Sequence, residues 1–133
     1  MELWIYSFHG VKMYLISVED HFESAHFLRG YRGKCEKLHG HRYKVVVRIE
    51  AQRLDKAGMA YDFTILKKQL HEIVGRYDHQ CLNDIAPFDQ RNPTAENIAF
   101  SFYDELLPFI SKKVKLESIE IWESPGSCAS YRP

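Results

Sequence analysis

The sequence predicts an α+β fold in which two helices cover one face of an antiparallel sheet. Alternating patterns typical of strands lie near both ends of the chain, and two patterns with helical spacing lie between them. The chain has 133 residues, the length of one ordinary domain, with no internal repeat and no linker rich in glycine and serine. We therefore expect the order β-β-α-α-β-β, with a short extra strand before the first helix.

Two long strands are predicted in the first half of the chain. In residues 14–26 and 42–51, apolar and polar side chains alternate, which is typical of a strand with one buried face. Asp20 interrupts the apolar series of the first strand, so we expect a bulge or bend there. Residues 59–61, which follow a turn, are predicted to form the short extra strand.

Two helices are predicted in the middle of the chain. Asp62 is suited to cap a helix whose apolar residues recur at helical spacing as far as Tyr77. The second helix begins where Asn92 or Thr94 can cap it, and it stops at or before Pro108.

The C-terminal part predicts two more strands, residues 116–123 and 128–131, joined by a turn. In the first of them, Glu117 and Glu123 share a face with two isoleucines, while Leu116 lies on the other face. An acidic side chain in line with apolar residues either points inward to a partner or is solvated at the strand end. The pattern leaves this choice open for Glu123.

Composition and charge exclude several classes of protein. Eighteen basic residues balance eighteen acidic ones, which argues against binding nucleic acid or a membrane by bulk charge. No apolar run reaches the length of about 18 residues that a membrane span needs. The three cysteines form no CxxC pair and their odd number does not suit a disulfide framework. We therefore expect a cytoplasmic protein with reduced thiols.

The first twelve residues differ in character from the rest of the chain. Residues 1–12 are rich in aromatic side chains and form a leader of unclear status that lacks the positive start of a signal peptide. Met13 is equally suited to be the first residue. We expect residues 13–133 to form a single domain.

Three histidines indicate a metal site. His39 and His41 are two residues apart, so in an extended chain their side chains point to the same side, which is also the side of Tyr43. On the first strand, His26 shares the face of the apolar residues. Three imidazoles with an open fourth position are typical of a catalytic zinc site. The alternative is that each is an ordinary, partly buried histidine with a hydrogen bond.

Cys35 lies four residues before His39 and therefore close to the predicted metal site. A thiol beside a metal ion and several cations can have a lowered pKa and act as a base. It can also be a small buried hydrophobic residue or a fourth zinc ligand. Local sequence does not decide among these three interpretations.

Asp78 and His79 follow the first helix. A carboxylate beside an imidazole can orient it for proton transfer. Adjacent residues seldom face each other, however, and a polar helix end with a histidine near the negative pole of the dipole is the simpler interpretation.

Residues 29–48 contain seven basic side chains and one acidic residue, Glu36. In a chain of zero net charge this is a local positive region beside the histidines. It would suit a polyphosphate substrate, although a solvated surface explains most of these residues individually.

Taken together, these residues resemble the 6-pyruvoyltetrahydropterin synthase family. The spacing between Cys35 and His39 is similar to that of its bacterial branch, the 6-carboxytetrahydropterin synthases of queuosine biosynthesis. The matching segments run in family order from about residue 13 to the C-terminus: 22–26, 35–41, 62–67, 78–83, 92–97 and 122–124.

The resemblance implies the tunnelling fold, or T-fold, with trimers that close a barrel and pair as hexamers. The implied substrate is 7,8-dihydroneopterin triphosphate. The implied products are 6-carboxytetrahydropterin, acetaldehyde and triphosphate, and no redox cofactor is needed.

The resemblance also implies a role for each site residue. Cys35 would accept the proton, and Asp78 with His79 would form a relay with it from a neighbouring subunit. Glu123 would anchor the pterin ring, with help from Thr94. The zinc ligands would be His26, His39 and His41.

Three alternatives to this activity remain open. The first is the reaction that forms 6-pyruvoyltetrahydropterin from the same substrate. The second is a non-catalytic zinc-binding module in which Cys35 completes a closed site with the three histidines. The third is a related enzyme that only cleaves the side chain as an aldolase.

Overall fold

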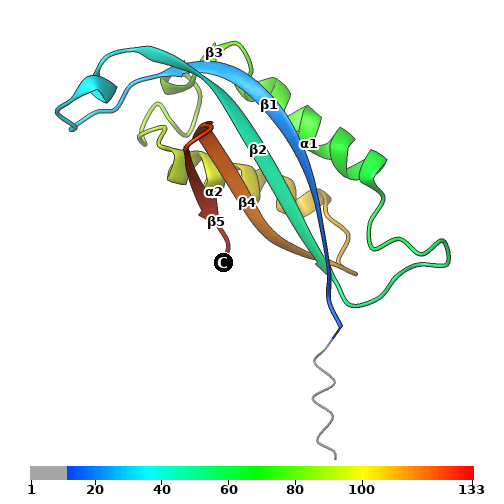
Figure 1. Ribbon diagram of the computed structural model, residues 1–133. Coiled ribbons are helices and arrows are strands. Elements are labelled where there is room, and N and C mark those ends of the chain that lie inside the picture. The colour runs from blue at the N-terminus through cyan, green and yellow to red at the C-terminus, as the bar shows by residue number, and fades with distance from the viewer. Residues whose placement is uncertain (1–11) are drawn as a thin grey trace, which may run out of the picture.

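The computed structural model describes residues 12–133, in which two helices lie against a five-stranded sheet (Figure 1). The predicted α+β class is confirmed. The prediction for residues 1–12 lies, apart from Lys12, outside the described residues. The elements are β1 (Tyr14–His26), β2 (His39–Ala51), α1 (Phe63–Tyr77), β3 (Gln80–Cys81), α2 (Ala95–Leu106), β4 (Lys115–Ser124) and β5 (Ser127–Tyr131).

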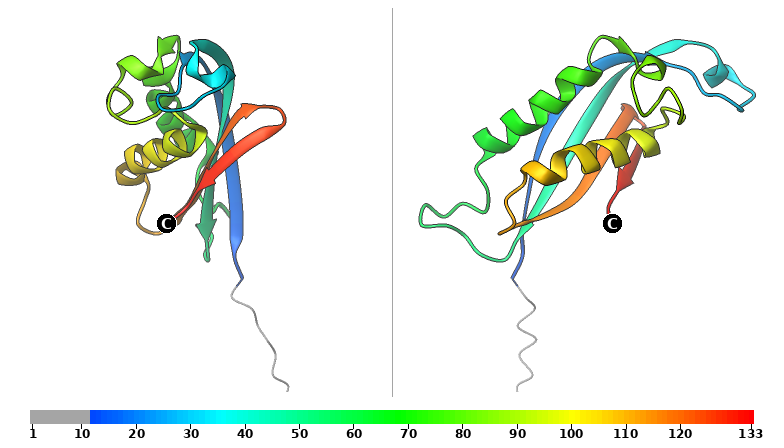
Figure 2. Two further views of the ribbon diagram at one scale, coloured as in Figure 1. Left: turned by 90° about the vertical axis from the view of Figure 1, so that its left-hand side faces the viewer. Right: turned by 180° about the vertical axis from the view of Figure 1, so that it is seen from behind.

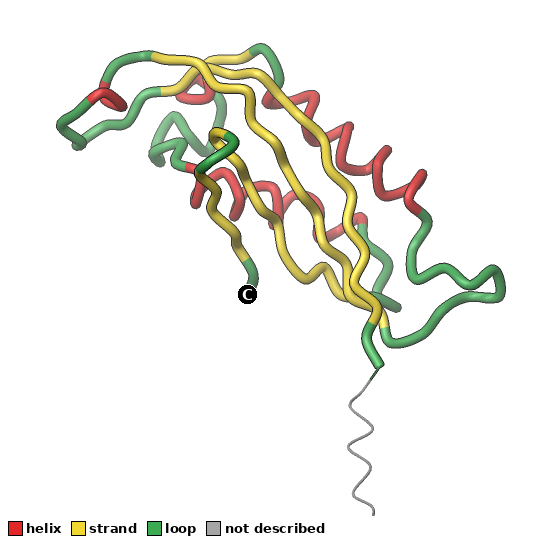
Figure 3. The backbone as a smooth tube through the Cα atoms, viewed as in Figure 1, coloured by secondary structure: helices red, strands yellow, loops and turns green. Residues whose placement is uncertain are grey.

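The strands are arranged in the order β3-β1-β2-β4-β5 (Figure 3). β1 and β2 pair in antiparallel register along their whole length, from Tyr14 opposite Ala51 to His26 opposite His39. β4 and β5 continue the antiparallel arrangement. The prediction of an all-antiparallel sheet is wrong at one edge, because the two residues of β3 run parallel to β1. The chain leaves α1 beside the C-terminal end of β1. Gln80 and Cys81 then pair with Ser24 and Ala25 and run in the same direction as β1.

The predicted strand at residues 59–61 is absent from the described sheet. The Asp55 carboxylate accepts hydrogen bonds from the backbone N–H groups of Ala57 and Met59, both at 2.9 Å. The backbone N–H of Asp55 also donates to the carbonyl of Met59. These bonds close a turn that engages both backbone groups of Met59, so this residue cannot pair with a strand of the sheet.

A β-bulge in β4 corrects the predicted faces of that strand. Arg48 pairs with Ser118, but the next residue, Ile49, pairs with Leu116, so Glu117 is the extra residue. The prediction placed Glu117 on the inward face and Leu116 on the outward face, and it is wrong. The bulge turns Leu116 into the core, where it is 2% exposed.

Both helices begin at the predicted kind of residue. The Asp62 side chain accepts a hydrogen bond from the N–H of Thr64 at 2.8 Å, as an N-cap does. For α2, Thr94 rather than Asn92 is the cap, and its hydroxyl accepts from the N–H of Asn97 at 3.1 Å. Within residues 12–133, no helix is long and apolar enough to cross a membrane.

The core lies between the helices and one face of the sheet. Figure 2 shows both helices on the same side, and the other sheet face has no helix over it. Phe22 of β1 stacks on Tyr43 of β2 and Phe102 of α2, with ring centroids 4.8 and 5.6 Å apart. This packing fixes the inward face of β1 and β2. The same face carries the histidines at the end of β1 and at the start of β2.

Candidate metal centre

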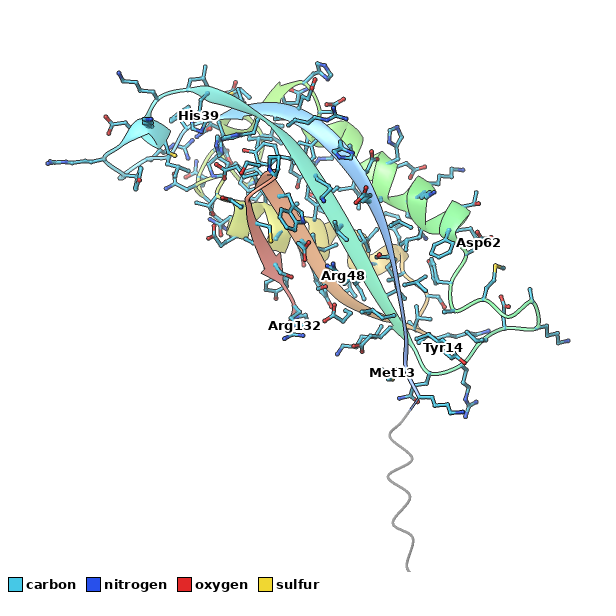
Figure 4. All side chains as sticks on the ribbon, viewed as in Figure 1. Met13, Tyr14, His39, Arg48, Asp62 and Arg132 are labelled. Atoms are coloured by element: carbon cyan, nitrogen blue, oxygen red, sulfur yellow. The ribbon has the colours of Figure 1, made fainter. Side chains whose placement is uncertain are left out.

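Three imidazole rings meet on the inward face of the sheet. His26 lies opposite His39 in the β1–β2 register, and His41 lies two residues further along β2, as the predicted parity requires. The ring centroids are 4.5 Å apart for His26 and His39, 4.8 Å for His39 and His41, and 5.2 Å for His26 and His41. Figure 4 labels His39 near the end of the β1–β2 pair.

Glu123 of β4 joins the three histidines. One donor atom from each of the four side chains lies within 4.8 Å of the other three. His26 is buried, and the other three residues are partly exposed. Of the two interpretations left open for Glu123, the structure favours the inward one.

Backbone carbonyls orient two of the rings. Nδ1 of His26 lies 2.7 Å from the carbonyl oxygen of Pro93, and Nδ1 of His39 lies 2.6 Å from that of Lys37. A carbonyl oxygen can only accept, so each Nδ1 carries the proton and each Nε2 of a neutral ring has a free lone pair.

Those two free lone pairs face each other. Nε2 of His26 and Nε2 of His39 are 2.9 Å apart. Two unprotonated nitrogens cannot form a hydrogen bond at this distance, whereas a cation between them would be bound by both. Two ligands at about 2.0–2.1 Å from one tetrahedral ion lie about 3.3 Å apart, close to this separation.

The third nitrogen completes the fit. Nε2 of His41 is buried and has no hydrogen-bond partner among residues 12–133. The Glu123 Oε1 atom is 3.0 Å away from it, but the pair lacks the geometry of a hydrogen bond. A buried polar atom without a partner is costly, and a metal ion would supply the partner. The donor set of three imidazoles and a carboxylate fits a transition-metal ion.

Burial keeps the histidines in the form that binds metal. Burial is the largest cause that lowers the pKa of His26, with smaller contributions from neighbouring histidines. Burial also lowers the pKa of His41, against the raising effect of Glu123. Both rings are therefore neutral at pH 7, as metal ligands must be.

Cys35 lies between His26 and His39 along the chain but is not one of the four grouped donors. It sits in a short 3₁₀ helix, Lys34–Glu36, in the connection between β1 and β2, and it is partly buried. The pKa of Tyr43 is raised mainly by burial, and also by the charges of Glu123 and Cys35. The Tyr43 hydroxyl is 3.1 Å from Nδ1 of His26. The connection that carries Cys35 begins after His26 and ends before His39, so Cys35 lies in a loop bounded by two of the histidines.

Asp78 and His79 contact each other although they are adjacent. Nδ1 of His79 lies 3.0 Å from Oδ2 of Asp78. His79 has a left-handed backbone with φ of 55°, which turns its ring back toward Asp78. The expectation that adjacent residues seldom face each other therefore does not hold for this pair. The other carboxylate oxygen accepts from the N–H of Glu23 at 2.9 Å, and this bond is the main cause of the lowered pKa of Asp78.

The Asp78–His79 pair is not grouped with the metal donors within the chain. The His79 side chain is 75% exposed and its nearest charged neighbour besides Asp78 is Glu23, on the outward face of β1. The structure thus forms the pair but presents it to the outside of the subunit.

The start of α2 adjoins the metal centre. Thr94 follows Pro93, whose carbonyl orients His26. Sequence reasoning identified Thr94 but missed Pro93, because a backbone carbonyl leaves no signature in the sequence. It also missed the hydroxyl of Tyr43, although this residue shares the parity of His39 and His41.

The basic region of residues 29–48 divides between two places. On the outward face of β2, Nζ of Lys44 lies 4.7 Å from the ring centroid of Trp122, and Arg48 pairs with Glu120 at 2.8 Å. Arg29 instead donates to the carbonyl of Phe88 at 3.0 Å, near the start of α2. Several of these cations are therefore not on the histidine face.

The fold and the site together are those of a class of small α+β enzymes with a histidine cluster that could hold a metal ion. A family model described as 6-pyruvoyl tetrahydropterin synthase matches residues 15–133. The chain therefore belongs to the 6-pyruvoyl tetrahydropterin synthase family.

Individual relatives carry related names. The chain is 36% identical over 121 residues to a 6-carboxy-5,6,7,8-tetrahydropterin synthase of Bacillus subtilis, covering 85% of this chain and 81% of that protein. It is also 36% identical over 124 residues to the protein of that name from Synechocystis, covering 90% and 93%. A solved structure of Caenorhabditis elegans 6-pyruvoyl tetrahydropterin synthase superimposes with a TM-score of 0.83 at 27% identity, covering 92% of this chain and 97% of that one.

Proposed function

We propose that the chain is a zinc-dependent lyase, a 6-carboxytetrahydropterin synthase of queuosine and 7-deazaguanine biosynthesis. It would convert 7,8-dihydroneopterin triphosphate and one water to 6-carboxy-5,6,7,8-tetrahydropterin, acetaldehyde and triphosphate. The observation that carries the proposal is the convergence of three imidazole nitrogens that lack other partners, in a chain whose relatives bear this name.

We assign the metal site to His26, His39 and His41. Bound zinc would act as a Lewis acid toward the hydroxyl groups of the substrate side chain. The carbonyls of Pro93 and Lys37 hold two of the rings in the required tautomer. Protein purified without added metal should contain close to one zinc per chain, and near-zero zinc that His39→Ala leaves unchanged would contradict this assignment.

We assign proton transfer to Cys35, assisted by Asp78 and His79. In support, the Cys35 thiol is free, and the connection that carries it joins His26 to His39. The Asp78 carboxylate faces Nδ1 of His79 and so leaves Nε2 to exchange protons. Glu123 would hold the pterin ring, because a carboxylate accepts two parallel N–H bonds from an amidine-like group. Thr94 at the start of α2 would contribute a further contact.

We also propose that the functional unit is a homo-oligomer, a hexamer made of two trimers. The Asp78–His79 pair points outward from its own chain, so it can serve the metal centre of a neighbouring subunit. The sheet has open edges at β3 and β5 that a neighbouring chain can cover. We place the protein in the cytoplasm, where its three free thiols stay reduced, and treat residues 13–133 as one domain.

Product analysis tests the proposed reaction. Purified protein incubated with 7,8-dihydroneopterin triphosphate should release acetaldehyde. A product that keeps every side-chain carbon would instead identify 6-pyruvoyltetrahydropterin synthase, which is the name of the family and of the C. elegans structure. Release of glycolaldehyde would identify an aldolase. Either outcome would overturn the proposed activity.

A further inference from the structure

Two asparagine side chains hold the segment that leaves β1 after His26. Asn83 accepts a hydrogen bond from the N–H of Phe27 and donates one to its carbonyl, both at 3.0 Å. Asn92 does the same to Arg29, at 2.9 and 2.8 Å. Each amide therefore engages both backbone groups of one residue, as a neighbouring strand would.

Leu28, which lies between Phe27 and Arg29, holds the connection that carries Cys35. Backbone N–H groups of consecutive residues in an extended chain point to opposite sides. The N–H of Leu28 accordingly points away from the two asparagines and donates to the carbonyl of Cys35 at 2.7 Å. The position of Cys35 is thus set by a three-residue stretch whose first and last members are clamped by Asn83 and Asn92.

Asn92 also connects this stretch to the metal centre. Its own backbone carbonyl accepts from the side chain of Asn97 at 2.8 Å, which fixes the start of α2. The next residue, Pro93, presents the carbonyl that orients the ring of His26. The same short segment therefore holds both the Cys35 connection and a metal ligand.

The side-chain amides of Asn83 and Asn92 can make these contacts in only one orientation. Asn83 is 4% exposed, and its oxygen and nitrogen each have a partner. Exchanging the two ends of either amide would place like groups against each other and lose both bonds. Such contacts hold the stretch of residues 27–29 at a fixed position relative to His26, and proton transfer is sensitive to shifts of about 1 Å.

We propose that Asn83 and Asn92 are positioning residues that place Cys35 relative to the metal centre. The inference rests on the proposed role of Cys35 in the reaction. It adds that the thiol is held by a clamp built from two other parts of the chain, the 3₁₀ helix Leu82–Asp84 and the segment before α2.

The variant Asn92→Ala tests this, because Asn92 is less buried than Asn83. Gln69→Ala is the matched control. The Gln69 amide also uses both ends, accepting from Tyr61 at 3.0 Å and donating to the carbonyl of Phe109 at 2.9 Å, but it lies on α1 away from Cys35. The rate of alkylation of Cys35 by iodoacetamide is measured by peptide mass spectrometry, which separates it from Cys81 and Cys128.

In Asn92→Ala, iodoacetamide should alkylate Cys35 several-fold faster than in the wild type. The substitution should lower kcat about 10- to 100-fold, with zinc content and KM close to those of the wild type. Gln69→Ala should change neither rate. A variant that alkylates and turns over like the control would overturn the inference.

If Asn92→Ala does not fold, Asn92→Asp keeps the acceptor for Arg29 and loses only the donor, and the same criteria apply. If the wild type releases no acetaldehyde, the proposed function fails, while the alkylation rates still decide whether Asn92 positions Cys35.

Discussion

Protonation determines what the three imidazoles can do. The carbonyls of Pro93 and Lys37 assign the proton to Nδ1 in His26 and His39, so both Nε2 atoms face each other as acceptors. Without a cation between them, the two lone pairs repel each other. In the histidine cluster the fold therefore holds repelling groups together at a cost that binding of a metal ion would offset.

This predicts how the stability of metal-free protein depends on pH. Burial lowers the pKa of His26 and His41 in the folded chain, so the unfolded chain binds more protons below the ordinary histidine value of about 6.5. The free energy of unfolding should therefore fall as the pH drops from about 7.5 to 5.5, by at most about 1.4 kcal/mol per pH unit for each histidine.

Urea denaturation of chelator-treated protein across this range measures the effect. Zinc-loaded protein is the reference, since protons and the ion compete for the same nitrogens. A free energy of unfolding that stays constant or rises on acidification would contradict the lowered pKa of His26 and His41.

At the residue scale, parity in the sequence was sufficient to predict the histidine site. His26, His39 and His41 converge because the alternation of side chains in two strands is a local property. The carbonyl of Pro93 and the asparagine clamp could not be predicted, since these contacts join segments more than fifty residues apart. The contact between Asp78 and His79 depends on one left-handed residue that no local pattern indicated.

At the scale of elements, helix capping positions the start of each helix. Asp62 accepts from the N–H of Thr64 at the start of α1. The substitution Asp62→Ala should lower the free energy of unfolding by about 1 kcal/mol, because the N–H of Thr64 in the first turn loses its side-chain acceptor. Chemical denaturation measures the change.

Asp104→Ala, which removes an exposed aspartate within α2, is the control and should change stability by less than about 0.5 kcal/mol. Equal effects of the two substitutions would show that the capping bond does not stabilise α1.

The strands show where element prediction succeeds and fails. β1 agrees with the predicted residues 14–26, but the bulge expected at Asp20 is absent, because β1 pairs with β2 past Asp20 without a register shift. The bulge at Glu117 could not be foreseen, since it depends on the register between β2 and β4. β3 was missed because two residues are too short to carry a pattern.

At the scale of the whole molecule, the sheet leaves one face without helices and two edges open. The outwardly directed Asp78–His79 pair adds a reason for neighbouring chains to assemble around these surfaces. The class of the fold was predictable from element order alone, but the proposed assembly would depend on surfaces that only the folded chain presents.

Mixing two inactive variants tests whether active sites are shared between subunits. Cys35→Ala and His79→Ala should each be inactive alone. In a randomly reassembled 1:1 mixture, about one quarter of the sites would combine an intact Cys35 with an intact His79 from the neighbour. Dissociation, mixing and reassembly should therefore restore about a quarter of the acetaldehyde-forming activity. No recovery, despite mixed oligomers shown by mass spectrometry, would place both residues in the same chain's site.

In the proposed enzyme, three histidines hold a metal ion while Cys35 stays outside its coordination and moves protons. The most direct test is to measure zinc content and turnover of the Cys35→Ala variant, with His39→Ala as the reference for lost binding. We predict that Cys35→Ala keeps the zinc of the wild type, remains folded and produces no acetaldehyde. Loss of zinc together with unfolding in Cys35→Ala would instead show a closed structural site and would contradict the account.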